Sequence, residues 1–343
     1  MIYELTICIP TYNRGKRALE LVNSILPNLK ENWSVMVLNN NSVDDTKFYD
    51  QIETLAKKHI QVEYIKHKIN CQFYGNFKSC LTYPNSKYVL LISDEDFVNF
   101  DELENIVNIL NQYPLIGACR TSVTPAKDLK EIMVSTTMPN KFFKAGEEAL
   151  NKFCFTNNYI SGIIYNLENI KKTNMIDILE KNLLSHKAYP HLYFDLLVSS
   201  KFDVMMTSKV SVFEGNPVYN HKDASGTKIT LFDHIGPYGY GERVNQFFSL
   251  RDGIFDAVKL LELNDSNTEL IVFLNIYFKL VEKYFYLIGM CNMPAYKRNH
   301  IEESLLKESF FYTCTAGVFA YPQVQPFKEV VLEALSAIYK KYK

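Results

Sequence analysis

Short apolar runs and segments of helical periodicity alternate along the first hundred residues of the chain. The runs suit strands buried on both faces, and the segments between them space their apolar residues three and four apart, as an amphipathic helix does. Strands are predicted at 5–9, 34–38, 61–65 and 88–92, and helices at 16–29, 44–58 and 74–81. This repeated order predicts an α/β domain with a doubly wound, largely parallel sheet.

The pattern continues less regularly as far as residue 215. It predicts helices at 101–112, 145–155 and 190–199, strands at 115–120, 159–165, 203–207 and 211–213, and a loop or hairpin at 121–141. Glycine then recurs through 215–241, as in a linker or a lid over a binding site. Helical spacing at 243–263, 269–290, 301–309 and 326–339 predicts a mainly helical carboxy-terminal domain. We therefore expect two domains, 1–215 and 216–343.

Polar loops follow three of the predicted parallel strands, at 10–14, 39–45 and 93–96. In doubly wound sheets, ligands bind beyond the carboxyl ends of the strands. We therefore expect the three loops to line one ligand-binding crevice.

Composition and charge narrow the class of protein. The 343 residues are 47% hydrophobic, which suits a soluble globular protein, and their net charge of -1 provides no overall field that would recruit nucleic acid. Seven cysteines without zinc or redox spacing indicate a reducing compartment. The chain opens without the features of a signal peptide, and polar residues interrupt its most apolar later stretch, 270–290. We expect a cytoplasmic protein without a membrane span and without a nucleic-acid partner.

The acidic triplet Asp94-Glu95-Asp96 follows the strand predicted at 88–92. Two carboxylates two residues apart at a strand end, as Asp94 and Asp96 are, suit one divalent cation. Hard oxygen ligands favour Mg²⁺ or Mn²⁺, which bind substrate phosphates as well. Taken alone, the triplet more readily fits an ordinary acidic turn. Its surroundings decide between the two interpretations.

Four ordered segments resemble those of the inverting family 2 glycosyltransferases, which have the GT-A nucleotide-binding fold. Tyr88–Phe97 is similar to the D-x-D segment of that family. Thr6–Arg14 is similar to its opening strand and nucleotide loop, and Val37–Thr46 to its second nucleotide loop. Asn70 and Asn76 match polar positions that precede the D-x-D segment. As an ordered set, these motifs are specific.

The resemblance covers residues 1–120 well and 155–215 loosely. It implies metal-dependent, inverting transfer of a sugar from a nucleotide-sugar donor. It places Mn²⁺ or Mg²⁺ on Asp96, with Asp94 helping or holding the ribose or a metal-bound water. The donor-binding positions that it implies are Pro10, Thr11, Tyr12, Arg14, Asn39, Asn41, Asn70, Asn76, Ser93, Asp94 and Glu95.

Two positions depart from the family pattern. Asn39 stands where the family commonly has an Asp expected at the nucleobase edge. Because Asn offers a donor as well as an acceptor, a base other than uracil is conceivable, although a UDP-sugar is favoured. The acidic pair that usually supplies the general base is also missing, and His191 lies close to its place. Asp195 shares a helical face with His191 and is the second candidate for the base, while a packed, structural histidine is the alternative.

Less specific candidates lie in the glycine-rich segment. His221, Asp223 and His234 could reach the diphosphate or the metal as parts of a closing lid. Surface loops collect such residues freely, so we give the lid less weight than the triplet.

We therefore expect a glycosyltransferase of bacterial surface-glycan synthesis, acting on a saccharide or lipid-linked saccharide acceptor. Peripheral contact with the inner face of the bacterial inner membrane and self-association through the carboxy-terminal helices are both open. Two other functions also stay open. One is a nucleotidyltransferase, which would be expected to show a glycine-rich, basic triphosphate loop. The other is a nucleotide-sugar binding module that has lost catalysis.

Overall fold

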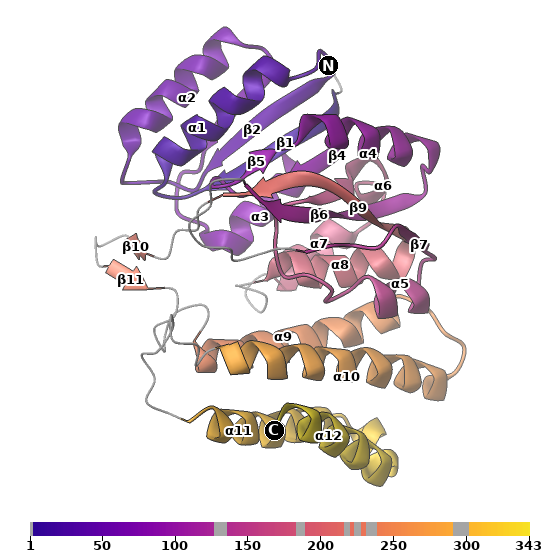
Figure 1. Cartoon of the computed structure of the whole chain (residues 1–343). Helices are drawn as coiled ribbons and strands as arrows, with labels where there is room; N and C mark the ends of the chain where they lie inside the picture. The colour runs from indigo at the N-terminus through magenta and orange to yellow at the C-terminus, as the bar shows by residue number, and fades with distance from the viewer. Residues whose placement is uncertain are drawn as a thin grey trace. The chain divides into compact units, whose positions relative to one another are not determined.

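The computed structural model describes residues 3–126, 136–182, 189–215, 220–222, 228–230, 239–290 and 302–343. The chain forms two compact units, Met1–Val218 and Tyr219–Lys343. The first is an α/β unit and the second is mainly helical (Figure 1), which confirms the predicted fold class.

A nine-stranded sheet forms the centre of the α/β unit, in the order β3-β2-β1-β4-β8-β6-β9-β5 with β7 paired to β9. The strands β3, β2, β1 and β4 run parallel, as the repeated βαβ pattern predicts. The sheet is mixed beyond them, because β8 enters between β4 and β6 and is antiparallel to both. The strands are β1 Tyr3–Thr11, β2 Trp33–Asn39, β3 Val62–Lys66, β4 Ser86–Leu91, β5 Phe97–Val98, β6 Ile116–Pro125, β7 Lys141–Phe143, β8 Ile163–Asn166 and β9 Asp203–Glu214.

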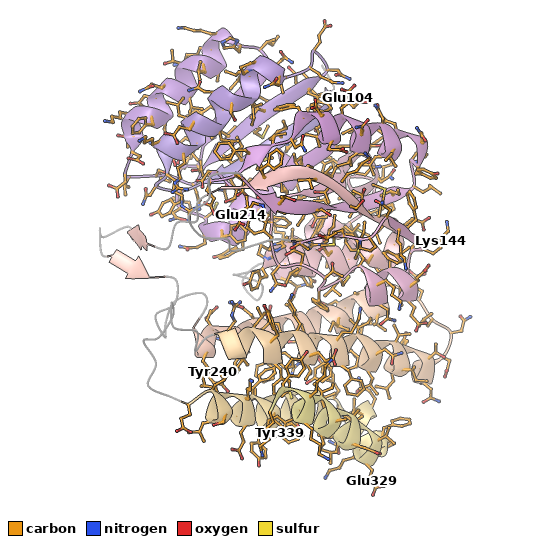
Figure 2. All side chains as sticks on the ribbon, in the orientation of Figure 1. Glu104, Lys144, Glu214, Tyr240, Glu329 and Tyr339 are labelled. Carbon is orange, nitrogen blue, oxygen red and sulfur yellow. The ribbon has the colours of Figure 1, made fainter. Side chains whose placement is uncertain are left out.

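Helices cover both faces of this sheet (Figure 1). Alternate residues of a strand point to opposite faces, so Leu5, Ile7 and Ile9 of β1 belong to a buried core shared with α1, α2 and α4. Cys8, between them, faces Cys80 of α3 on the other side. Side chains fill the space between the layers (Figure 2). The helices are α1 Gly15–Ile25, α2 Thr46–Lys58, α3 Gln72–Thr82, α4 Phe100–Gln112, α5 Glu147–Lys152, α6 Leu167–Ile170, α7 Met175–Asn182 and α8 Pro190–Lys201, with a 3-10 turn at Leu26–Asn28.

Three predicted boundaries change in ways that bear on the site. The two strands predicted at 203–207 and 211–213 are one strand, β9, whose register against β6 shifts after Thr207. The helix predicted at 145–155 is shorter, and Phe155 beyond it has a left-handed φ of 62°. The strand predicted at 159–165 begins only at Ile163, so the residues before it are free to turn toward the acidic triplet.

The second unit consists of helices and a short hairpin. Phe247 packs edge-to-face against Tyr277, Tyr284 and Phe310, so aromatic rings from three helices form much of its core. No helix among the described residues is long and apolar enough to cross a bilayer. The elements are β10 Asn220–Lys222, β11 Lys228–Thr230, α9 Tyr240–Lys259, α10 Ser266–Met290, α11 Glu303–Phe319, a 3-10 segment Pro322–Phe327 and α12 Lys328–Tyr342.

Candidate active site

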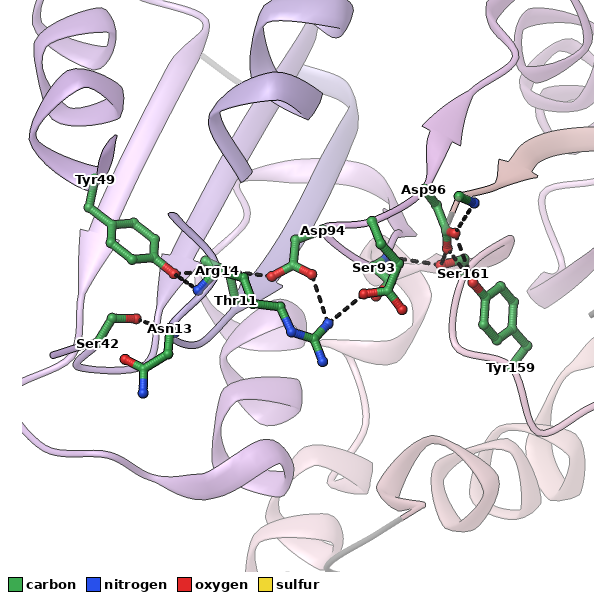
Figure 3. Close-up of polar contacts among 12 residues, drawn as sticks. Thr11, Asn13, Arg14, Ser42, Tyr49, Ser93, Asp94, Asp96, Tyr159 and Ser161 are labelled. Carbon is green, nitrogen blue, oxygen red and sulfur yellow. Dashed lines mark hydrogen bonds and ion pairs between the residues drawn. The ribbon is translucent and has the colours of Figure 1, made fainter. Parts of the chain in front are cut away.

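The parallel register brings the three predicted loops to one edge of the sheet. Thr11, the last residue of β1, pairs with Asn39, the last residue of β2. On the other side of β1, the backbone N–H of Ile92 donates to the carbonyl of Cys8, so the chain leaves β4 beside the end of β1. The loops after β1, β2 and β4 therefore meet (Figure 3), and the predicted convergence is confirmed.

Thr11 ties the end of β1 to the acidic triplet. Its hydroxyl donates to Asp94 Oδ2 at 2.6 Å. The Tyr49 hydroxyl lies 2.9 Å from Thr11 Oγ1 and accepts from the backbone N–H of Arg14 at 3.1 Å. Because the single proton of Thr11 goes to Asp94, Tyr49 is the donor to Thr11. This chain of bonds fixes the first loop and the Asp94 carboxylate relative to each other.

Arg14 carries the positive charge of the site. Its Nη1 contacts Asp94 Oδ1 at 3.0 Å and Glu95 Oε2 at 2.5 Å, and its side chain is 19% exposed. Burial raises the pKa of Glu95 to about 8, with Asp94 and Asp96 adding to the rise and Arg14 opposing it. Arg14 contacts Asp94 and Glu95, and a cation on the other side of the triplet would favour the charged form of Asp96.

Asp96 lies fully buried on the far side of the triplet from Arg14 (Figure 3). The Tyr159 hydroxyl is 2.8 and 2.7 Å from its two oxygens, Ser161 Oγ is 2.5 Å from Oδ2, and the backbone N–H of Gly215 donates to Oδ1 at 2.9 Å. Burial raises the pKa of Asp96, and these donors oppose the rise. Gly215 must be glycine, because a Cβ there would lie 1.5 Å from the carbonyl oxygen of Glu95.

The side chain of Asn39 holds the loop after β2. Its Nδ2 donates to the Tyr64 hydroxyl at 2.8 Å, and its Oδ1 accepts from the backbone N–H of Ser42 at 2.8 Å. Asn41 is half-buried and has a left-handed φ of 59°, a conformation that Asn tolerates. The predicted contact of Asn39 with a nucleobase stays a prediction, and the second amide N–H and the second lone pair of Oδ1 could serve it.

Asn13 joins the first two loops, a role that the sequence analysis did not assign. Its Oδ1 accepts from the backbone N–H groups of Val43 and Asp44 at 2.8 and 3.1 Å. Its own N–H donates to Ser42 Oγ at 2.9 Å. The left-handed φ of Asn13, 55°, is the local signal for such a turn.

Asn70 and Asn76 brace the second loop against α3. Asn70 Oδ1 accepts from Asn40 Nδ2 at 2.9 Å. Asn76 Nδ2 donates to the carbonyl of Leu38 at 3.1 Å, and its Oδ1 lies 3.1 Å from His67 Nε2. Their predicted contact with the donor is not tested by these bonds, which already occupy much of both side chains.

Pro10, Tyr12 and Ser93 complete the set of predicted donor positions. All three are half-buried at the same edge of the sheet. The backbone N–H of Ser93 donates to Ser161 Oγ at 2.8 Å, so Ser161 links both ends of the triplet segment. Asp223 and His234 of the predicted lid lie outside the described residues.

The two predicted bases lie inside the unit on α8. The Asp195 carboxylate pairs with Arg120 and accepts from the Tyr165 hydroxyl at 2.7 Å. His191 Nε2 is 2.9 Å from the carbonyl of Asn158, and burial lowers the pKa of His191 to about 3, with Arg120 as the second cause. Both side chains are buried, so the contacts give them structural roles. Either one would have to leave these contacts to take a proton from a hydroxyl.

The donor set of the triplet suits Mg²⁺ or Mn²⁺, because carboxylate oxygens are the ligands that these cations prefer. Among the described residues, no three acidic, histidine or cysteine side chains converge as they would around a metal. Asp94 faces Thr11 and Arg14, whereas Asp96 faces Tyr159, Ser161 and Gly215. The residues therefore fit a divalent cation by their chemistry, provided that Asp96 exchanges one of its protein donors for it.

Comparison with known proteins supports the class of this site. Residues 6–165 match the sequence model of the family described as Glycosyl transferase family 2. S. aureus TarS 1-349 in complex with UDP has a similar structure, with a TM-score of 0.60, 13% sequence identity, and coverage of 99% of this chain and 89% of that chain. For TarS 1-349 in complex with UDP-GlcNAc the TM-score is 0.58, the identity 13%, and the coverage 99% and 90%. A search of curated proteins gives no significant match.

The region that carries the site, residues 6–165, is thus similar to glycosyltransferase family 2, and this match supports a glycosyltransferase. The family model spans the loops after β1, β2 and β4, which confirms the resemblance found in the sequence. At 13% identity, the likeness to TarS shows the fold.

The buried ion pair gives the first prediction. Asp195→Asn should lower the free energy of unfolding by roughly 3–5 kcal/mol, because the Arg120 charge is left buried without its partner. Asp203→Asn is the matched control, since it breaks the more exposed pair with Lys144 and should cost far less. Urea unfolding followed by fluorescence of Trp33, the single tryptophan, reports on the α/β unit. Equal losses in the two variants would contradict a structural role for Asp195.

The low pKa of His191 gives the second prediction. The folded protein resists protonation down to about pH 3, whereas the unfolded chain takes up the proton near the ordinary value of 6.5. The histidine therefore leaves stability unchanged above pH 6.5 and removes it as the pH falls from 6.5 toward 3. His191→Gln, which keeps an N–H for the Asn158 carbonyl, should lose less stability over this range. Parallel pH profiles for the wild type and the variant would show that His191 is not buried in its neutral form.

Proposed function

We propose that this chain transfers a sugar from a nucleoside-diphosphate sugar, with UDP-sugars favoured, to a hydroxyl of a saccharide acceptor with inversion at the anomeric carbon. The observation that carries the proposal is the pairing of Arg14 with Asp94 and Glu95, next to the buried Asp96, at the strand ends of a domain that matches family 2. The binding of UDP and UDP-GlcNAc by TarS, whose fold is similar, supports a uridine nucleotide as the donor.

Residues at the carboxyl ends of β1, β2 and β4 are suited to each part of the nucleotide-sugar donor. The guanidinium of Arg14 is partly exposed and is the charged group suited to a diphosphate oxygen. Pro10 and Tyr12 lie at the end of β1, and Asn39 and Asn41 lie at the end of β2, where a nucleoside would contact them. Asp94 and Asp96 would hold Mn²⁺ or Mg²⁺, which neutralises charge on the departing diphosphate.

The acceptor side of the reaction follows from the sequence prediction. His191 and Asp195 stay the candidate bases, and a conformational change that exposes α8 would be needed for either to act. A lipid-linked saccharide acceptor at the inner face of the bacterial inner membrane is part of the proposal, with the enzyme in the cytoplasm. The carboxy-terminal helices would then provide acceptor contacts or self-association. The six described cysteines are free thiols, which suits a reducing compartment.

The role of Asp96 gives the third prediction. UDP should be released from a UDP-sugar in the presence of Mn²⁺, and Asp96→Ala should lower the rate about 100-fold or more because a charge-stabilising group is lost. Asp101→Ala, at an exposed acid in the first turn of α4, is the matched control and should keep the wild-type rate.

The outcomes of this assay separate the alternatives. Normal UDP release by Asp96→Ala would remove the triplet from the mechanism. Tight nucleotide binding without turnover of any donor sugar would instead indicate a binding module that has lost catalysis.

A further inference from the structure

Two separate backbone segments supply three hydrogen-bonding groups to Asp96, and the three groups contact its two oxygens differently. The Tyr159 hydroxyl lies within 2.8 Å of both carboxylate oxygens. Ser161 contacts Oδ2 alone, and the Gly215 N–H contacts Oδ1 alone. A carboxylate accepts about four hydrogen bonds, and these three groups supply three protons. Tyr159 is therefore the group that spans the two oxygens, the position that a chelated cation would take.

The segment that carries Tyr159 and Ser161 is fixed from inside the unit. His191 contacts the carbonyl of Asn158 at 2.9 Å, and Arg120 Nη1 reaches the carbonyl of Tyr159 at 3.5 Å. The Arg120 side chain is in turn paired with Asp195. These contacts hold the backbone of the segment that orients Asp96.

The Asp96 carboxylate is fully buried, so a cation cannot reach it from solvent in this arrangement. Ser161 and Gly215 each leave one side of the carboxylate free and can stay in place when a cation binds. Tyr159 cannot, because its hydroxyl occupies both oxygens. Its aromatic ring is attached to the segment ahead of β8, and the backbone bonds of that segment to β4 and β6 begin at Gly162.

We propose that Tyr159 and Ser161 are positioning residues for Asp96 with opposite effects on a divalent cation. The Tyr159 hydroxyl covers the carboxylate until the cation displaces it, whereas Ser161 keeps the carboxylate oriented before and after binding. The proposal rests on the assignment of Asp96 to the cation in the proposed function.

The test measures Mn²⁺ binding directly, by the loss of the electron paramagnetic resonance signal of free Mn²⁺, on the full chain with saturating UDP. Tyr159→Phe should bind Mn²⁺ about threefold to tenfold more tightly, because one hydrogen bond no longer has to be broken. Ser161→Ala should bind Mn²⁺ about tenfold more weakly, because an oriented carboxylate loses its support. Tyr88→Phe removes a tyrosine hydroxyl that bonds Asn111 and should leave Mn²⁺ affinity unchanged.

The variants separate this proposal from the proposed function. If the wild type binds Mn²⁺ and Asp96→Ala does not, but Tyr159→Phe binds as weakly as Ser161→Ala or like the wild type, the displacement by the cation is wrong while the role of Asp96 stands. If the wild type binds UDP but no Mn²⁺, both the displacement and the cation role of Asp96 are wrong. Thermal unfolding of each variant confirms that the fold is kept.

Discussion

A carboxylate that is buried away from water needs hydrogen-bond donors around it. For Asp96, these donors come from parts of the chain that are widely separated in sequence. Tyr159 and Ser161 come from the segment ahead of β8, and the Gly215 N–H comes from the end of β9. The Gly215 N–H reaches this carboxylate while its Cα lies against the backbone carbonyl of Glu95, which explains the requirement for glycine at 215. The edge of the sheet is thus organised around a charge rather than around an apolar core.

Arg120, Asp195 and His191 form a second set of buried polar contacts, which hold the segment that contacts Asp96. A buried ion pair contributes little net stability, because desolvation of the two charges offsets their attraction, but breaking it is costly. The pair between Arg120 and Asp195 therefore acts less as a source of stability than as a constraint on geometry. The ion pair places Arg120 within hydrogen-bond reach of the Tyr159 carbonyl oxygen. His191 contacts the carbonyl oxygen of the preceding residue, Asn158. In this structure His191 and Asp195 of α8 thus help to hold the segment that contacts Asp96.

Sequence patterns predicted the parallel half of the sheet because that half consists of local βαβ units, each readable within about 30 residues. The same patterns located the strand-end loops, since Thr11, Asn39 and Asp94 all follow apolar runs directly. The antiparallel entry of β8 between β4 and β6 was not predictable, because it depends on pairing between strands that are distant in sequence.

The partners of Asp96 were missed for a similar reason. Tyr159 and Gly215 lie 63 and 119 residues from it, and neither position carries a motif. The asparagines were identified as polar positions of the donor site, but their amides also hold the loops together. A polar residue at a strand end can serve the backbone as readily as a ligand. Only the geometry distinguishes the two uses.

The central claim is that the acidic triplet serves the diphosphate of a nucleotide sugar through a cation on Asp96. A crystal structure of the full chain with UDP and Mn²⁺ tests it most directly. The account predicts anomalous density for Mn²⁺ between the diphosphate and Asp96, with the Tyr159 hydroxyl moved off the carboxylate and Ser161 still bonded to it. UDP bound at this edge without Mn²⁺, and with Tyr159 still across both oxygens of Asp96, would contradict it.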